Sequence, residues 1–102
     1  DYAMVGVAAT VSLDERGRCS GGRIVLLSVG EGPTLAHKAM ATVQGELPTP
    51  ELIAAAAEVC AMQDIDPTAD IHASVAFRRQ LAKVLTKRAL TEAFQRARQE
   101  IQ

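Results

Sequence analysis

The largest group of chemically competent side chains in this 102-residue chain is a basic run near the C-terminus. Five cationic residues fall within eleven positions of a helical pattern, namely Arg78, Arg79, Lys83, Lys87 and Arg88. Such a run could contact nucleic-acid phosphates, or it could be the solvated face of a helix. The chain has a formal net charge of −1, no Trp, one Tyr and two Phe. Nucleic-acid binding calls for a net basic surface and stacking aromatics, so the composition favours the solvated face and no nucleic-acid partner.

Metal and nucleophile chemistry is not indicated by the remaining reactive side chains. His37 and His72 stand apart, without a metal-ligand spacing to a Cys or a carboxylate. Cys19 and Cys60 are separated by 41 positions and form no Cys-x-x-Cys motif. Two such cysteines favour free thiols in a reducing cytoplasm, with a disulfide as the weaker alternative. The residues alone therefore predict an interaction or support domain that is not catalytic by itself.

The first third of the chain predicts a long antiparallel hairpin. Apolar residues alternate with small ones from Tyr2 to Leu13, which is the period of a strand with one buried face. The segment 14–17, DERG, is a turn signal in which Gly17 can adopt a positive φ. A second run from Gly22 to Gly30 is apolar on both faces, as expected for a strand covered on both sides.

Helical periodicity follows the hairpin. Apolar residues recur at helical spacing from Leu35 to Val43, and Gly45 stands where a C-terminal cap belongs. Thr49 is the expected N-cap of the next helix, with Pro50 at its first position. These signals predict two helices that are joined by a short loop.

A break at Asp66–Pro67 separates the second helix from a long final one, which Ser74 or Asp70 would cap and which would reach about Gln99. The order of elements predicts the α+β class. We expect a two-layer sandwich, in which a small antiparallel sheet, a long hairpin with the option of a short third strand, carries about three helices on one face. The length indicates a single domain, 1–102. No apolar run approaches the roughly 20 residues of a membrane span and no signal peptide is visible, so we expect no membrane partner and a cytoplasmic location.

Arg88 is the unusual member of the basic run. On a helical wheel it falls in the middle of an apolar stripe that consists of Phe77, Leu81, Val84 and Leu85. A guanidinium on a buried face needs a carboxylate or carbonyl partner. We expect an internal ion pair with Glu92 or with an acidic loop residue, Asp66 or Asp70. The alternative is a contact with another module.

A second apolar stripe runs along the opposite side of the same helix, and it consists of Leu90, Phe94, Ala97 and Ile101. A helix that is apolar on two sides is either buried between layers or packs against a surface outside its own domain. The first predicted strand also has a second face of small residues. Both features indicate that the domain forms part of an interface.

Three segments together resemble one known family. They are DYAMVGVAATVSLDERG at 1–17, VGEGPTLAHKAMATVQGE at 29–46 and DIHASVAFRRQLAKVLTKRALTEA at 70–93. The chain is similar to the C-terminal domain of the FAD-binding medium subunit of molybdenum hydroxylases, the family of carbon monoxide dehydrogenase, xanthine dehydrogenase and aldehyde oxidase. Two departures stand out. Relatives carry Glu-Tyr where this chain has Ala76-Phe77, and the upstream FAD-binding region of the family is absent from these residues.

The resemblance implies a role in an oxidoreductase. In this family, electrons from a molybdenum centre pass through iron–sulfur clusters to FAD, and the molybdenum large subunit and the iron–sulfur small subunit are separate chains. The C-terminal domain closes one side of the flavin cleft and contributes to subunit contacts. The positions expected near the flavin are Ile24 and Lys38.

The resemblance also implies that FAD is bound only together with the FAD-binding domain, and that the basic helix is a framework element. Its expected framework or interface residues are Arg78, Arg79, Arg88, Leu90 and Phe94, and guanidinium groups suit carboxylate partners. The alternative function is a free-standing interaction module that has lost the redox role and forms a homodimer in isolation.

Overall fold

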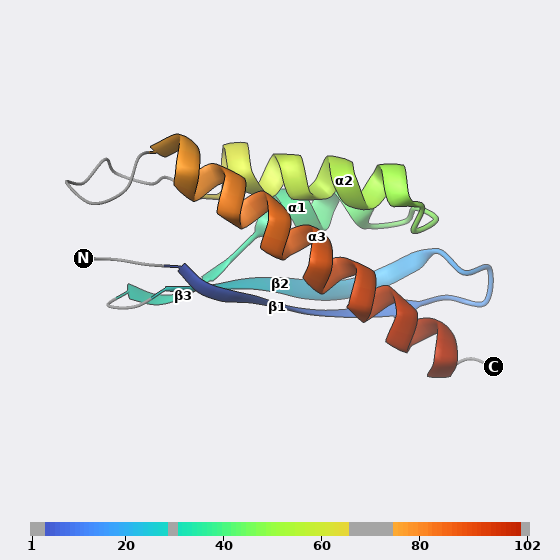
Figure 1. The fold of residues 1–102 in the computed structure, drawn as a ribbon. Coiled ribbons are helices and arrows are strands. Elements are labelled where there is room, and N and C mark those ends of the chain that lie inside the picture. Colours follow the sequence, from blue (N-terminus) through green and yellow to red (C-terminus); the bar gives the residue numbers. More distant parts are fainter. Residues whose placement is uncertain (1–3, 29–30, 66–74, 101–102) are drawn as a thin grey trace.

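The computed structural model describes residues 4–28, 31–65 and 75–100. Its elements follow one another in the order β1 (Met4–Leu13), β2 (Cys19–Ser28), β3 (Glu31–Leu35), α1 (His37–Val43), α2 (Pro50–Val59), the π-helical turn η1 (Cys60–Asp64) and α3 (Val75–Glu100). Figure 1 shows the three α-helices on one side of the sheet, with α3 crossing it diagonally. The predicted α+β sandwich is confirmed, including the optional third strand.

The sheet is a three-stranded antiparallel meander with the order β1-β2-β3. Gly17 takes a φ of 81° in the hairpin turn, as the DERG signal predicts. The strand β3 is the short third strand that the sequence left as an option. Leu35 pairs with Val25 in the sheet, so α1 begins at His37 and the expectation of a helix from Leu35 was wrong by two residues.

The helix caps match the sequence signals. The hydroxyl of Thr49 accepts a hydrogen bond from the Leu52 N–H at 3.1 Å, and Pro50 is the first residue of α2. Gly45 follows α1 with a φ of 78°, and its N–H donates to the Cys19 carbonyl at 2.8 Å. The predicted caps of α3, Ser74 and Asp70, lie outside the described residues.

The core lies between the sheet and the helices, and α3 contributes the second apolar stripe to it. Leu90, Phe94 and Ala97 are buried, and the first two belong to the same cluster as Ile24 of β2. Of the two alternatives for this stripe, burial between layers therefore holds for these three residues, because the domain's own sheet covers them. Ile101 is not among the described residues.

The first stripe of α3 is the more exposed of the two. Phe77 is 61% exposed and Val84 is 41% exposed, whereas Leu81 and Leu85 are half-buried. Arg88 shares this outer side and is exposed, so the predicted internal position was wrong. In the part of the chain that the structure describes, its guanidinium makes no ion pair with Glu92, and Asp66 and Asp70 lie outside that part. Desolvation therefore does not demand a partner for Arg88.

Both cysteines are free and buried, as expected for thiols that form no disulfide. Burial raises the pKa of the Cys60 thiol, which also accepts a hydrogen bond from the Thr86 hydroxyl at 3.4 Å. Burial likewise raises the pKa of the Cys19 thiol. Neutral, enclosed thiols of this kind are weak nucleophiles, so neither residue is a candidate for covalent chemistry.

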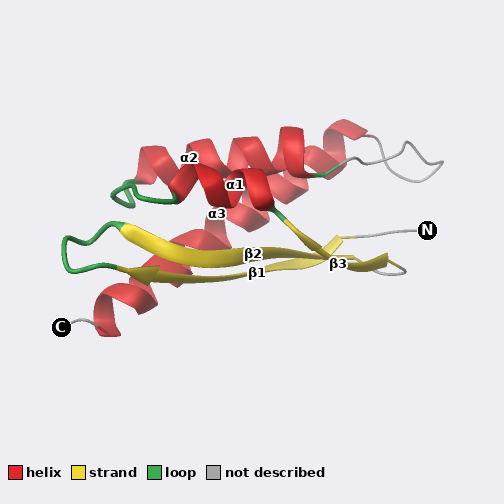
Figure 2. Cartoon of the chain, turned by 180° about the vertical axis from the view of Figure 1, so that it is seen from behind, coloured by secondary structure: helices red, strands yellow, loops and turns green. Residues whose placement is uncertain are grey.

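One face of the sheet carries no helix of the described chain (Figure 2). We call it the open face. The strand register and the alternation of side chains assign to it Gly6, Ala8, Thr10 and Ser12 of β1, Arg23, Val25 and Leu27 of β2, and Leu35 of β3. None of the described helices is long and apolar enough to cross a membrane.

Candidate functional site

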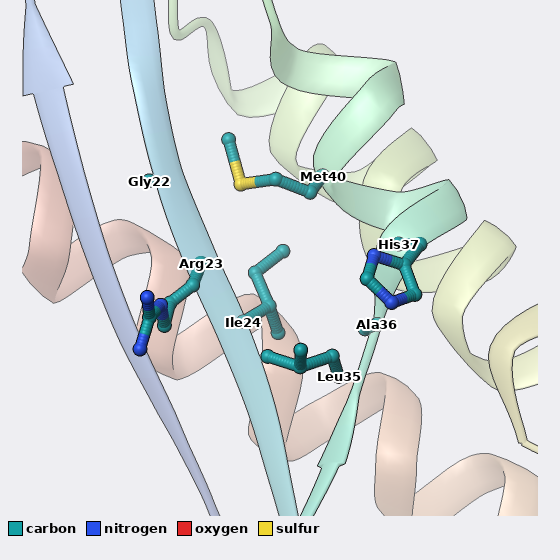
Figure 3. Close-up of a pocket in the computed structure, with 7 residues that line it drawn as sticks. All are labelled: Gly22, Arg23, Ile24, Leu35, Ala36, His37 and Met40. Atoms are coloured by element: carbon teal, nitrogen blue, oxygen red, sulfur yellow. The ribbon is translucent and has the colours of Figure 1, made fainter.

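A small pocket lies at the edge of the sheet, where β3 turns away from β2 into α1 (Figure 3). We call it the β2–α1 pocket. Its volume is about 180 Å³, and its lining consists of Gly22, Arg23, Ile24, Leu35, Ala36, His37 and Met40. Figure 3 shows Ile24 and Met40 extending toward each other across it, whereas Arg23 points to the other side of β2. The pocket wall is therefore mainly aliphatic, with His37 at the start of α1 and the Arg23 guanidinium on the other side of β2.

The strand register creates this pocket. β3 pairs with β2 only over the segment from Val25 to Ser28, so the preceding part of β2 has no strand on this edge. The chain instead crosses at Ala36, whose N–H donates to the Ile24 carbonyl at 2.8 Å. α1 then begins immediately, and one turn later it brings Met40 over Ile24. Ile24 is only 1% exposed, so it belongs to both the core and the pocket floor.

Lys38, the second residue expected near a cofactor, lies beside this pocket rather than in its lining. It follows His37 in the first turn of α1, and its side chain is exposed. Ile24 and the start of α1 thus lie close together, and their position near a flavin stays a prediction. A lysine there can extend over the pocket rim or remain in solvent, because its long stem is flexible.

Asp64 holds the first turn of α1 in place, and the sequence analysis did not identify it. Its two carboxylate oxygens accept hydrogen bonds from the backbone N–H groups of Lys38 at 2.8 Å and Ala39 at 2.7 Å. Charge-assisted hydrogen bonds contribute about 1.5–3 kcal/mol each. The only signal for this role was an acidic residue at the end of an apolar helix, and its partner lies 26 positions earlier in the chain.

The basic helix supports the turn that carries Asp64. The guanidinium of Arg79 donates to the carbonyl oxygen of Ala61, which belongs to η1. Lys83 forms an ion pair with Glu58 of α2 at 2.9 Å, and both side chains are substantially exposed. Arg78 is half-buried. We expected the arginines to bind carboxylates, but Arg79 binds a backbone carbonyl instead.

A second cleft lies between α3 and β1. Its volume is about 280 Å³, and Arg88, Glu92 and Arg96 stand along the helix side, with small residues of β1 opposite. The Arg96 guanidinium donates to the Ala9 carbonyl at 3.2 Å and so occupies part of the free edge of β1. A charged side chain that covers the edge of a strand opposes pairing with another strand.

These two sites offer surfaces that suit recognition of a ligand or a partner. In the described ranges, no three His, Cys, Asp or Glu side chains lie close enough together to hold a metal ion. The β2–α1 pocket offers a mainly aliphatic wall, with Arg23, His37 and Lys38 as nearby cationic or polar groups. Such a surface suits one face of a planar ring system whose other face is held by another part of the protein.

Comparison with known proteins identifies the class as a domain of a redox flavoprotein. Residues 1–93 match the sequence profile of the family described as the CO dehydrogenase flavoprotein C-terminal domain. The chain therefore belongs to the CO dehydrogenase flavoprotein C-terminal domain family, the class that molybdenum-hydroxylase-type dehydrogenases contain.

Individual relatives are similar over almost the whole chain. The 6-hydroxypseudooxynicotine dehydrogenase complex subunit alpha of Paenarthrobacter nicotinovorans is 37% identical over 98 residues, which are 96% of this chain and 33% of that protein. Quinoline 2-oxidoreductase from Pseudomonas putida 86 has 30% identity and a TM-score of 0.77 over 95% of this chain and 37% of that one. Carbon monoxide dehydrogenase from Hydrogenophaga pseudoflava has 25% identity and a TM-score of 0.75, with coverages of 94% and 36%. The chain thus spans about a third of the length of these relatives.

Proposed function

We propose that this domain closes one side of the FAD cleft in the flavin subunit of a molybdenum-hydroxylase-type oxidoreductase. Ile24 and Met40 form the aliphatic wall that faces the flavin, and Lys38 stands at its rim. The observation that carries the proposal is the pocket in which β2 and the start of α1 converge. Asp64 and Arg79 serve as positioning residues, because they fix α1 and η1.

The pocket suits one side of the cofactor rather than the whole of it. Its 180 Å³ is smaller than the roughly 300–1,000 Å³ of pockets that enclose drug-sized ligands. Its aliphatic lining is compatible with a flavin ring, whereas the lining residue best suited to a charged pyrophosphate, Arg23, points to the other side of β2. When FAD is bound to the complete subunit, it would accept electrons and pass them on. This chain contributes one wall of the cleft and excludes water from it.

The proposed partners follow from the same role. The immediate partner is the FAD-binding domain, and the wider assembly includes a molybdenum large subunit and an iron–sulfur small subunit. A relative whose name describes it as a subunit of a dehydrogenase complex supports this kind of assembly. We propose a cytoplasmic location, because buried free thiols are stable in a reducing compartment.

The test is flavin retention by a chimera. The 98 aligned residues of the Paenarthrobacter subunit are replaced by this chain, and the purified chimera is compared with the same subunit lacking those residues. The flavin-to-polypeptide ratio is measured by absorbance after gel filtration. We expect the chimera to approach one flavin per chain and the shortened subunit to lose most of its flavin. Equal ratios in the two proteins would refute the proposed role.

A further inference from the structure

We infer that the open face is the surface on which the FAD-binding portion of the subunit packs, and that this contact is centred on Val25, Leu27 and Leu35. The inference deepens the proposed function and rests on it. The open face lies opposite the three helices, and nothing in the described chain covers it (Figure 2). Leu27 is 37% exposed and Leu35 is 45% exposed.

The apolar residues are concentrated at one end of this face. On this face, the pairs toward the start of β1 are Gly6 with Leu27 and Ala8 with Val25, and Leu35 extends the group across β3. Toward the hairpin turn the face becomes polar, with Thr10 opposite Arg23 and Ser12 opposite Gly21. A contiguous apolar patch at one end indicates an interaction site rather than scattered exposure.

The position of this patch identifies its occupant. β1 begins at Met4, which pairs with Ser28, the neighbour of Leu27. Any polypeptide that precedes β1 therefore joins the domain at the apolar end of the open face. Relatives are about three times as long as this chain, and the matching family is a C-terminal domain. The preceding portion of such a subunit is consequently within immediate reach of Leu27.

Leu35 connects the open face with the candidate site. It pairs with Val25 on this face and also lines the β2–α1 pocket at the sheet edge. A domain that covers Val25, Leu27 and Leu35 thus extends to the rim of the pocket in which Ile24 and Met40 lie. One docked partner can bury the apolar patch and hold a flavin against the pocket wall.

The inference is tested by thiol accessibility, which does not depend on flavin. Leu27→Cys is introduced into the 102-residue chain and into the chimera, and labelling by a polar maleimide is followed by mass spectrometry. The matched control is Leu47→Cys, since Leu47 is 46% exposed and lies near Gly17, by the hairpin turn at the far end of the sheet. Native Cys19 and Cys60 are buried and label slowly.

We expect the thiol introduced at position 27 to label at least about tenfold more slowly in the chimera than in the isolated chain, because a docked face is open only a small fraction of the time. The control should label at similar rates in both proteins.

Equal labelling rates at position 27 in the two proteins would overturn the inference, even if flavin is retained. Protection without flavin retention would support the surface and refute the proposed function. If the Leu27→Cys chimera also labels at Cys19 and Cys60, and so has not folded, Leu35→Cys is the second reporter.

A second copy of this chain is the competing occupant of the open face. Its signature is slow labelling at position 27 in the isolated chain that appears as the protein concentration rises, together with a dimer in sedimentation. That outcome would overturn the assignment to the FAD-binding portion, because self-association would then explain the apolar patch.

Discussion

Replacement of Gly22 by Ala is expected to destabilise the domain by about 3 kcal/mol or more. Gly22 has a φ of 151°, which residues with a side chain rarely adopt. A Cβ atom there would lie 2.9 Å from the Cα of Val11 and closer still to the carbonyl oxygen of Thr10. Both obstructing atoms are backbone of the paired strand, so β1 and β2 would have to separate. The check is the midpoint of urea unfolding, followed by circular dichroism.

The neighbouring glycine supplies the control. A Cβ on Gly21 would meet no atom within 4 Å, and the backbone there has no unusual φ. Gly21→Ala should therefore change the free energy of unfolding by less than about 1 kcal/mol. If the two variants unfold at the same urea concentration, the close approach of β1 to β2 at Gly22 is not a feature of the folded protein. If Gly22→Ala is recovered only as aggregate while Gly21→Ala is soluble, the expectation is met.

Phe94→Ala is expected to cost about 3–5 kcal/mol, the usual range for loss of a buried phenylalanine. Among the described residues, Phe94 is the largest fully buried side chain, and it belongs to the cluster formed by sheet and helices. A domain of this size has a total stability of about 5–15 kcal/mol, so the variant should be near its unfolding midpoint at modest urea concentrations. The free energy of unfolding is measured by chemical denaturation.

The other phenylalanine of the chain lies on the same helix and makes a matched comparison. Phe77 is 61% exposed, so Phe77→Ala should cost no more than about 1 kcal/mol. If Phe77→Ala lowered the free energy of unfolding as much as Phe94→Ala does, the stripe that contains Phe77 would also have to form part of the core. The pair of variants thus tests which face of α3 forms the core.

The sequence was sufficient for features that depend on local backbone chemistry. Period-two alternation located the hairpin, and Gly17, Gly45 and Thr49 marked a turn and two helix caps, because each of these signals acts within a few residues. The strand β3 was only an option, because its Gly and Pro residues are equally typical of a turn. Its pairing with Val25 depends on the register of β2, which local propensity does not determine.

The side chains of α3 show why the site was harder to predict. A helical wheel gives the angle between two apolar stripes but not which stripe meets the sheet. Ala93 and Ala97 allow the Leu90–Phe94 side to approach β1 closely, so Arg88 is left in solvent. Likewise, Asp64 contacts the start of α1 only because η1 returns the chain to it. Contacts of this kind depend on tertiary packing, and no short sequence pattern encodes them.

The assignment of the β2–α1 pocket as a flavin wall can be tested with a single indole. The chain contains no Trp, and Met40 extends into the pocket opposite Ile24. An indole in contact with a flavin ring stacks on it and quenches its emission. Met40→Trp in the chimera places the probe at the wall, whereas Met62→Trp places it on an exposed position of η1.

The measurement is the emission lifetime of the bound flavin in the two variants and in the unmodified chimera. We predict a short lifetime for Met40→Trp, and for Met62→Trp a lifetime equal to that of the unmodified chimera. Flavin that is retained in full but emits with the same lifetime in all three proteins would contradict the account, because the pocket would then not face the cofactor.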